Sequence, residues 1–87
     1  MKNLPMDLLR AFVSVAQLNS FTKAGELLGR SQPAVSLQIQ RLEELVDEQL
    51  LLRNGKHLEL SEAGGSLYGY ANQILNLNDL AISQLSK

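Results

Sequence analysis

The sequence has no cysteine, no tryptophan, a single histidine (His57), and only two phenylalanines and two tyrosines among its 87 residues. The absence of cysteine excludes a disulfide scaffold, a thiolate metal site and a cysteine nucleophile. One histidine excludes a multi-histidine metal site, and no spacing of His, Asp, Glu and a nucleophile matches a catalytic motif. We therefore expect no enzyme activity, no metal and no cofactor. With so few aromatic rings, the core is expected to be aliphatic.

Long apolar runs are also missing. No uninterrupted apolar stretch approaches the roughly 20 residues that span a bilayer, and none follows Lys2 as a secretory signal would require. The hydrophobic fraction of 45% is ordinary for a folded chain, and the length leaves room for one domain. The sequence therefore predicts a soluble, cytoplasmic protein.

The formal net charge of −1, taken as a whole, argues against a nucleic-acid partner, because proteins that bind nucleic acid usually carry a basic patch. The charge is unevenly distributed, however. Residues 1–42 hold five basic and two acidic residues, a net charge of +3, whereas residues 43–62 hold two basic and six acidic residues, a net charge of −4. Residues 63–87 are balanced. This asymmetry is more informative than the total, and it leaves the N-terminal half compatible with an anionic partner.

Apolar residues at helical spacing predict a first helix that begins near Pro5 and stops around Leu18–Asn19. Its buried face is expected to hold Leu8, Leu9, Phe12, Val13, Val15 and Ala16. Ser20 can cap a second, short helix that Gly29 ends after about two turns. The apolar side of this second helix is predicted to be Ala24, Leu27 and Leu28.

A third helix is predicted after Ser31, which is a good N-cap, and Pro33 is tolerated in the first turn that follows. Its buried stripe is expected to be Val35, Ile39, Leu42 and Val46. The opposite side carries Gln32, Ser36 and Gln40. The helical pattern fades after Glu48.

The rest of the chain predicts a hairpin and a long helix. Residues 49–53 can form a short strand, Asn54–Gly55 is a strong turn signal, and residues 57–60 alternate as a half-buried strand does. Ser61 can then cap a helix over residues 62–87. Apolar residues recur along it at spacings of three and four: Ala63, Leu67, Tyr70, Ala71, Ile74, Leu77, Ala81 and Leu85. Because Leu75, Leu80 and Ile82 lie beside this stripe, the apolar surface is wider than one face and indicates a partner.

These elements predict a mainly α fold, a winged helix-turn-helix of three helices and a two-stranded β wing, followed by a long C-terminal helix. Within residues 22–48, a short helix, a tight turn and a second helix with a polar outer face form the helix-turn-helix pattern. We expect residues 1–61 to be the winged helix-turn-helix and residues 62–87 to be a linker or dimerisation helix.

Over nearly its whole length the chain resembles the N-terminal DNA-binding domain of LysR-type transcriptional regulators. The matching residues are Leu9, Phe12, Val15, Ala16, Ser20-Phe21-Thr22, Ala24, Glu26, Leu28, Ser31-Gln32-Pro33-Ala34-Val35-Ser36, Gln38-Ile39, Leu42-Glu43, Leu50, Arg53, Leu60 and Ser61-Glu62-Ala63-Gly64. One departure is Asp47, which stands where a glycine commonly ends the third helix, so the exit turn is one place where this chain can differ from the family. Family members carry a larger C-terminal effector-binding domain, which is absent here, so we expect an isolated or truncated DNA-binding domain.

The resemblance implies double-stranded DNA as the partner, with the third helix in the major groove, which accepts an α-helix. Residues expected to contact base edges are Gln32, Pro33, Ala34, Ser36 and Gln40. Residues expected at the DNA backbone or on the wing are Lys23, Arg30, Ser31, Arg41, Arg53, Lys56 and His57. Of these, the resemblance places Arg53, Lys56 and His57 on the wing, beside the neighbouring minor groove.

The resemblance also makes the partner of the last helix a second copy of the chain. The residues expected on the dimer helix are Leu67, Tyr70, Ala71, Ile74, Leu77 and Ala81. A two-fold homodimer would set two third helices about one DNA turn apart or more, on a pseudo-palindromic site.

A winged helix also serves as a protein–protein interaction module, and that function would suit the acidic total charge. The charge of the third helix separates the two functions. Because Arg30 and Arg41 flank its polar side, DNA is favoured. For Gln40 a solvated position is as plausible as a DNA contact, and Arg41 can equally form a surface ion pair with the acidic residues that follow it.

Two further expectations concern side chains away from the polar face. Phe12 and Phe21 are predicted to lie in the core rather than to stack on bases. The acidic residues within 43–48 are predicted to face solvent, away from DNA, where they do not repel phosphate.

Overall fold

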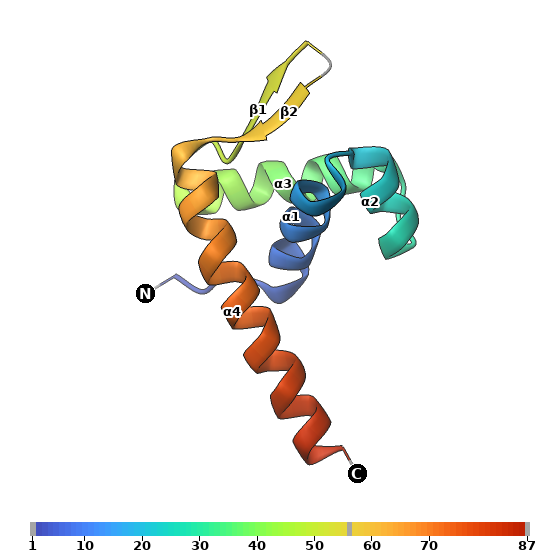
Figure 1. Ribbon diagram of the computed structural model, residues 1–87, viewed down its shortest axis with the longest axis vertical. Helices are drawn as coiled ribbons and strands as arrows, with labels where there is room; N and C mark the ends of the chain where they lie inside the picture. The colour runs from blue at the N-terminus through green and yellow to red at the C-terminus, as the bar shows by residue number, and fades with distance from the viewer. Residues whose placement is uncertain (1, 56, 87) are drawn as a thin grey trace.

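The computed structural model describes residues 2–55 and 57–86. The elements follow in the order α1 (Met6–Leu18), α2 (Phe21–Leu28), α3 (Gln32–Val46), β1 (Leu51–Asn54), β2 (His57–Leu60) and α4 (Glu62–Leu85) (Figure 1). This order confirms the predicted winged helix-turn-helix with a long C-terminal helix.

Helix α1 lies at the centre of the fold, and α2, α3 and α4 all pack against it (Figure 1). The largest fully buried side chains are Leu9, Phe12, Val15, Val35, Leu42 and Leu50. Fully burying one such side chain contributes roughly 1.5–3 kcal/mol. The core is aliphatic as predicted, and Phe12 is the one aromatic residue buried within the described part of the chain. Its ring meets that of Tyr68 edge to face, with centroids 6.4 Å apart.

Three serines cap three helices, as the sequence predicted. The hydroxyl oxygen of Ser20 accepts a hydrogen bond from the Lys23 N–H at 3.0 Å. That of Ser31 accepts one from Ala34 at 3.3 Å, and that of Ser61 accepts one from Gly64 at 2.9 Å. Each cap satisfies a backbone donor that the helix itself leaves unpaired, which is worth about 1 kcal/mol. The starts of α2, α3 and α4 are therefore set by local sequence.

The predicted apolar side of α2 is wrong at one position. Leu27 is 67% exposed, whereas Ala24 is buried and Leu28 is half-buried. A helix of 8 residues has room for only one narrow buried side, and α2 points that side at both α1 and α3. Gly29 ends the helix with φ +69°, a left-handed conformation that glycine adopts without steric cost.

Asp47 ends α3 in the left-handed conformation that usually requires glycine. Its φ is +55°, and its N–H donates to the Glu43 carbonyl oxygen. The exit turn therefore keeps the glycine-type geometry although the chain has no glycine there. Asp tolerates this conformation better than most residues, but it still carries a steric cost.

Replacing Asp47 with glycine is expected to stabilise the fold by about 0.5–1 kcal/mol, because it removes the cost of the positive φ. It also removes a negative charge from the negative end of the helix dipole. Thermal unfolding followed by circular dichroism measures the change. Asp47→Asn is the matched control, because it removes the charge but keeps a Cβ atom at the positive φ, and it should recover only part of the gain. A lower midpoint for Asp47→Gly would contradict the strain argument.

The wing is an antiparallel hairpin whose register pairs Leu51 with Leu60 and Asn54 with His57. The turn begins one residue later than predicted, because Asn54 still belongs to β1 and it is Gly55 that has a positive φ, +62°. Lys56 lies outside the described residues. At the base of the hairpin, Leu51 is buried and Leu60 is half-buried, so the wing is anchored to the body at the end far from its turn.

Helix α4 begins against the segment that precedes the wing. The Ser61 N–H donates to the Leu50 carbonyl oxygen at 3.0 Å. Gly64 lies so close to this carbonyl that a Cβ atom added at Gly64 would overlap the Leu50 oxygen. At the adjacent Gly65 an added Cβ would meet nothing within 4 Å. The two neighbouring glycines therefore have opposite surroundings.

The first half of α4 covers the core, and its second half projects from the body (Figure 1). Ala71 and Leu75 are buried against the body, with 0% and 7% exposure. Two expectations are thereby corrected: Ala71 has no surface left for a partner, and Leu75 belongs to the core-facing side of the helix. Within the residues that the structure describes, no helix is both long and apolar enough to cross a membrane.

One ion pair connects α1 to the projecting half of α4. The Arg10 guanidinium donates to the Asp79 carboxylate, which also accepts from the Asn78 side-chain amide. Both bonds favour the charged carboxylate and hold the pKa of Asp79 below its usual value of 3.8. The pair therefore stabilises the fold at neutral pH, and its contribution is lost only as the pH falls through that lowered pKa.

Candidate nucleic-acid interface

The exposed side of α3 brings most of the predicted base-reading residues together. Gln32, Pro33 and Gln40 are exposed, while Ala34 and Ser36 are half-buried. Gln32 and Ser36 contact each other, because the Gln32 Nε2 donates to the Ser36 Oγ at 2.9 Å. This bond uses one N–H of the exposed Gln32 amide, so the amide still offers its carbonyl oxygen as an acceptor and a second N–H as a donor.

The N-terminus of α3 has fewer free backbone donors than a typical helix. Pro33 has no N–H, and the N–H of Ala34 is taken by the Ser31 cap. Of the first three residues of α3, only Gln32 has a backbone N–H that is not used within the described residues. The Ser31 hydroxyl accepts in the cap and keeps its own hydrogen for donation to an external acceptor.

Leu37 is a residue of this surface that the sequence pattern did not single out. It is 45% exposed. It lies one helical turn after Pro33 and one turn before Gln40 and Arg41, so it falls in the middle of the exposed side. The sequence signal that could have identified Leu37 is its helical spacing from Pro33 and from Gln40, which puts all three on one side of the helix. An apolar side chain at the centre of a polar surface is suited to contact with another apolar group, such as a thymine methyl.

Basic side chains flank the polar side of α3 as far as Arg41. Lys23, Arg30 and Arg41 are all exposed. In the described part of the chain the one ion pair is Arg10–Asp79, so Arg41 does not form the surface pair that its acidic neighbours allowed. Beyond Arg41 the helix differs, because Glu44 is exposed one turn after Gln40. The surface therefore changes from basic to acidic along α3, and its N-terminal half is the part suited to an anion.

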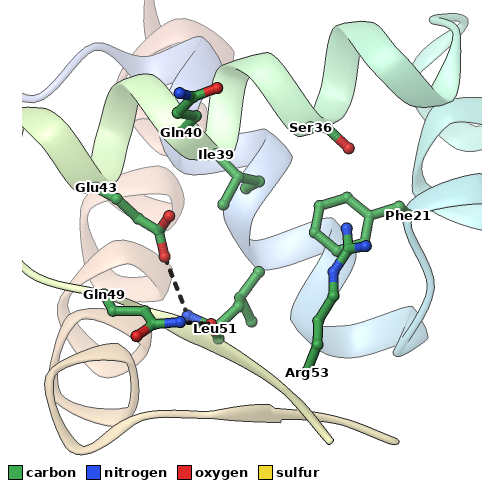
Figure 2. Close-up of a pocket in the computed structure, with 8 residues that line it drawn as sticks. All are labelled: Phe21, Ser36, Ile39, Gln40, Glu43, Gln49, Leu51 and Arg53. Atoms are coloured by element: carbon green, nitrogen blue, oxygen red, sulfur yellow. Dashed lines mark hydrogen bonds between the residues drawn. The ribbon is translucent and has the colours of Figure 1, made fainter. Parts of the chain in front are cut away.

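Glu43 has a structural function that corrects the expectation for the acidic segment. Glu44, Asp47 and Glu48 are exposed, but Glu43 is half-buried. Its Oε2 accepts a hydrogen bond from the backbone N–H of Leu50 at 2.7 Å. It also accepts one from the backbone N–H of Leu51 at 3.4 Å (Figure 2). This carboxylate thereby connects α3 to the root of the wing.

A hollow separates α3 from the wing, and Figure 2 shows the side chains around it. They are Phe21, Ser36, Ile39, Gln40, Glu43, Gln49, Leu51 and Arg53. Gln49 closes one side, because its Nε2 donates to the Leu51 carbonyl oxygen at 3.2 Å. The Ser61 hydroxyl donates to the Gln49 carbonyl oxygen and joins the start of α4 to the same segment.

Arg53 reaches from β1 across this hollow to α2. Its guanidinium carbon lies 4.3 Å from the centroid of the Phe21 ring (Figure 2). Phe21 packs against the core, as the sequence predicted, but it is only half-buried, so part of its ring stays accessible. His57, at the start of β2, is exposed. Lys56 was predicted to contact DNA and cannot be placed, because it lies outside the described residues.

The interface as a whole presents neutral hydrogen-bonding groups on the exposed side of α3, between basic side chains on α2, before α3 and on the wing. Residues 6–65 match the family model for the bacterial regulatory helix-turn-helix protein, lysR family. The chain belongs to the LysR family. It is 48% identical over 83 residues to the transcriptional regulator PecT of Dickeya dadantii, which covers 95% of this chain and 26% of PecT. Over 76 residues it is 50% identical to the regulator BudR of Raoultella terrigena, covering 87% of this chain and 26% of BudR.

Solved LysR-type structures have the same fold. The DNA-binding domain of BenM in complex with benA site 1 DNA has a TM-score of 0.89 and 37% identity, covering 95% of this chain and 93% of that one. DarR of Vibrio fischeri in complex with DNA has a TM-score of 0.91 and 33% identity, covering 98% of this chain and 29% of DarR. The chain spans about a quarter of the length of PecT and BudR, 26% in each case. Both relatives are named as transcriptional regulators and not as enzymes.

Proposed function

We propose that this LysR-type domain binds double-stranded DNA sequence-specifically, as the DNA-binding part of a transcriptional regulator that works in the cytoplasm. The observation that carries the proposal is the exposed side of α3, where donor and acceptor groups lie between basic residues that form no ion pair within the described residues. The DNA complexes of BenM and DarR, which have the same fold, support it.

Base reading is assigned to the N-terminal half of α3. In the major groove, the free carbonyl oxygen and N–H of Gln32 match the N6 and N7 atoms of an adenine. Ser36 can donate to a base or a phosphate, and Pro33 and Ala34 can contact a thymine methyl. Gln40 extends this surface by one turn. Because Glu44 follows on the same side, deeper insertion of α3 would bring a carboxylate towards the phosphates, which limits DNA contact to the part of α3 before Glu44.

Contacts to the DNA backbone are assigned to the residues around that helix. Lys23, Arg30 and Arg41 are exposed and can neutralise phosphates, which positions the protein without reading sequence. The Ser31 hydroxyl can donate to a phosphate at the start of α3. On the wing, Arg53 and His57 are exposed, and we assign them to the neighbouring minor groove.

We assign dimer formation to residues 62–87, and the winged helix-turn-helix to residues 1–61. Tyr70 and Leu77 are 63% and 67% exposed, and Ala81 is exposed on the same stripe of α4. Ile74 lies between them and is half-buried, as is Leu67. Leu67 and Ile74 pack against the core, whereas Tyr70, Leu77 and Ala81 are exposed, so a second copy can cover these three without displacing the buried Ala71. Such a homodimer suits a pseudo-palindromic site.

Selection from a random pool of duplexes tests the proposal. We expect an enriched, roughly two-fold-symmetric sequence and an affinity that falls as salt rises, because phosphate contacts release counterions. Equal binding of all duplexes would contradict specific reading. No binding to any duplex would leave the winged-helix protein–protein interaction module as the function.

Gln32→Ala and Arg53→Ala are expected to have different effects on DNA binding. Loss of Gln32 should relax the preference at one base pair per half-site by roughly 1–3 kcal/mol. Loss of Arg53 should weaken all sequences about equally and reduce the salt dependence by roughly one phosphate contact per half-site. Titrations of the selected duplex and its single-base variants, at several salt concentrations, separate the two effects.

Gln17→Ala is the matched control for the first variant, because it truncates an exposed glutamine of α1 outside the proposed interface. It should leave both affinity and preference unchanged. An unchanged base preference in Gln32→Ala would contradict the assignment of that residue to a base edge.

A further inference from the structure

We propose that Phe21 is a positioning residue for DNA binding, because its ring holds the Arg53 guanidinium of the wing beside the exposed side of α3. This inference rests on the proposed function, since it concerns how a DNA-contacting arginine is placed. Phe21 itself is not assigned any contact with DNA. We call the ring, in this function, the Arg53 seat.

The geometry of the seat is that of a cation–π interaction. The guanidinium carbon of Arg53 lies 4.3 Å from the ring centroid, well inside the roughly 6 Å at which such pairs attract. Arg53 is an exposed residue of a hairpin arm, where an unsupported arginine would sample many rotamers. In Figure 2 its side chain instead extends over Phe21, on the side of the hollow that Ser36 also lines.

Two side-chain contacts thereby add to the apolar packing that attaches the wing to the helix-turn-helix. At its root, the Glu43 carboxylate accepts from the backbone N–H groups of Leu50 and Leu51. Further along β1, two residues after Leu51, the Arg53 side chain rests on α2. The Glu43 contact fixes the start of β1, and the contact with Phe21 fixes the position of the Arg53 guanidinium. Together they set the distance between the wing cation and α3.

The seat holds the guanidinium without neutralising it. Arg53 forms no ion pair within the described residues, and Glu43, the carboxylate that lines the same hollow, is already occupied by backbone N–H groups. A guanidinium stacked on a ring through one face keeps the N–H donors along its edge available. The charge is therefore available to a phosphate or to the floor of a groove.

Preorganisation of the Arg53 side chain explains why removing the Phe21 ring is expected to weaken DNA binding. A flexible arginine loses rotamer freedom when it binds DNA, and that loss weakens binding. An arginine that is already held on Phe21 has lost much of this freedom in the free protein. If instead the seat kept Arg53 away from DNA, removing the ring would strengthen binding, so the sign of the change decides between the two.

The experiment compares Phe21→Leu with Phe21→Tyr in binding to the duplex that the wild-type chain selects. Phe21→Leu removes the ring but keeps an apolar side chain, and it should weaken binding roughly three- to tenfold. Phe21→Tyr keeps the ring and should bind within about twofold of wild type. In an Arg53→Ala background, Phe21→Leu should cause no further loss. Unchanged or tighter binding by Phe21→Leu would overturn the proposal, as would an equal loss in the Arg53→Ala background.

A second measurement needs no DNA and keeps the test independent of folding and of the proposed function. In the free wild-type chain, the NMR signal of the Arg53 side-chain N–H should be shifted by the ring current of Phe21, and the shift should vanish in Phe21→Leu. Circular dichroism shows whether that variant is folded. Absence of the shift in the wild type would overturn the seat. If the shift is present but no duplex is selected, the proposed function fails and the positioning of Arg53 for DNA fails with it.

Discussion

Gly64→Ala is expected to lower the free energy of unfolding by about 2–3 kcal/mol. The new methyl group would overlap the Leu50 carbonyl oxygen, and its next neighbours are the Leu50 carbonyl carbon at 3.0 Å and a Leu60 methyl at 3.2 Å. The first two are backbone atoms, which cannot rotate away as the end of a side chain can. Overpacking of this kind typically costs 1–3 kcal/mol, and here it falls on a junction of three segments.

The added methyl group would also disturb the hydrogen bonds that Leu50 makes at this junction. The same Leu50 carbonyl accepts a hydrogen bond from Ser61, and the Leu50 N–H donates to Glu43. Moving Leu50 to make room for a methyl group strains both bonds. The melting temperature should fall by roughly 10–20 °C, since each kcal/mol shifts the midpoint of so small a domain by about 4–8 °C.

Gly65→Ala is the matched control, with the opposite expected sign. It adds the same methyl group one residue later, where nothing lies within 4 Å. Alanine is a better helix former than glycine by about 1 kcal/mol, so this variant should be more stable than wild type. Thermal unfolding of both variants compares them directly. Equal midpoints for the two variants would contradict the close approach at Gly64.

Leu77→Glu is expected to abolish the proposed dimer and to weaken binding to a two-fold site by about 100-fold or more. Leu77 is 67% exposed in one chain, so a charged residue there costs little in folding. In a dimer it would lie on the covered stripe, where an unpaired buried carboxylate is strongly unfavourable. The loss in affinity follows from losing the second half-site, because linking two binding sites raises overall affinity by roughly 10²–10⁴.

Asn76→Glu is the matched control for that variant. It introduces the same carboxylate one residue earlier on α4, at an exposed position outside the stripe. Sedimentation at high micromolar concentration should give a dimer mass for the wild type and for Asn76→Glu, and a monomer mass for Leu77→Glu. A monomer mass for the wild-type chain would contradict dimer formation through this helix.

Much of the fold could be predicted from the sequence because its signals are local. Ser20, Ser31 and Ser61 are caps that act within four residues, and the spacing of Val35, Ile39 and Leu42 describes one face of one helix. Such features depend on neighbours along the chain. They need no knowledge of where other elements lie, so periodicity and capping preferences suffice.

The features that were missed depend on pairs of elements. In the sequence, Glu43 is one of several acidic residues in a charged segment. It accepts hydrogen bonds from backbone N–H groups only because the fold places the start of the wing beside it. Phe21 and Arg53 are distant in sequence, so no spacing relates them. Ala71 and Leu77 fall in the same run of apolar residues, yet one side of α4 faces the body and the other does not. The sequence of a helix alone does not show which of its sides the rest of the domain will cover.

The ion pair between Arg10 and Asp79 restrains the direction in which α4 leaves the body. Helix α4 leaves the body near Leu75, and the ten residues from there to Leu85 extend about 15 Å. A tilt of about 10° at the point of departure would move the far end by roughly 3 Å. In a dimer built on this helix, that tilt would also change the separation of the two α3 helices. The Arg10–Asp79 contact therefore bears on which half-site spacings a dimer can span, although it adds little to the stability of one chain.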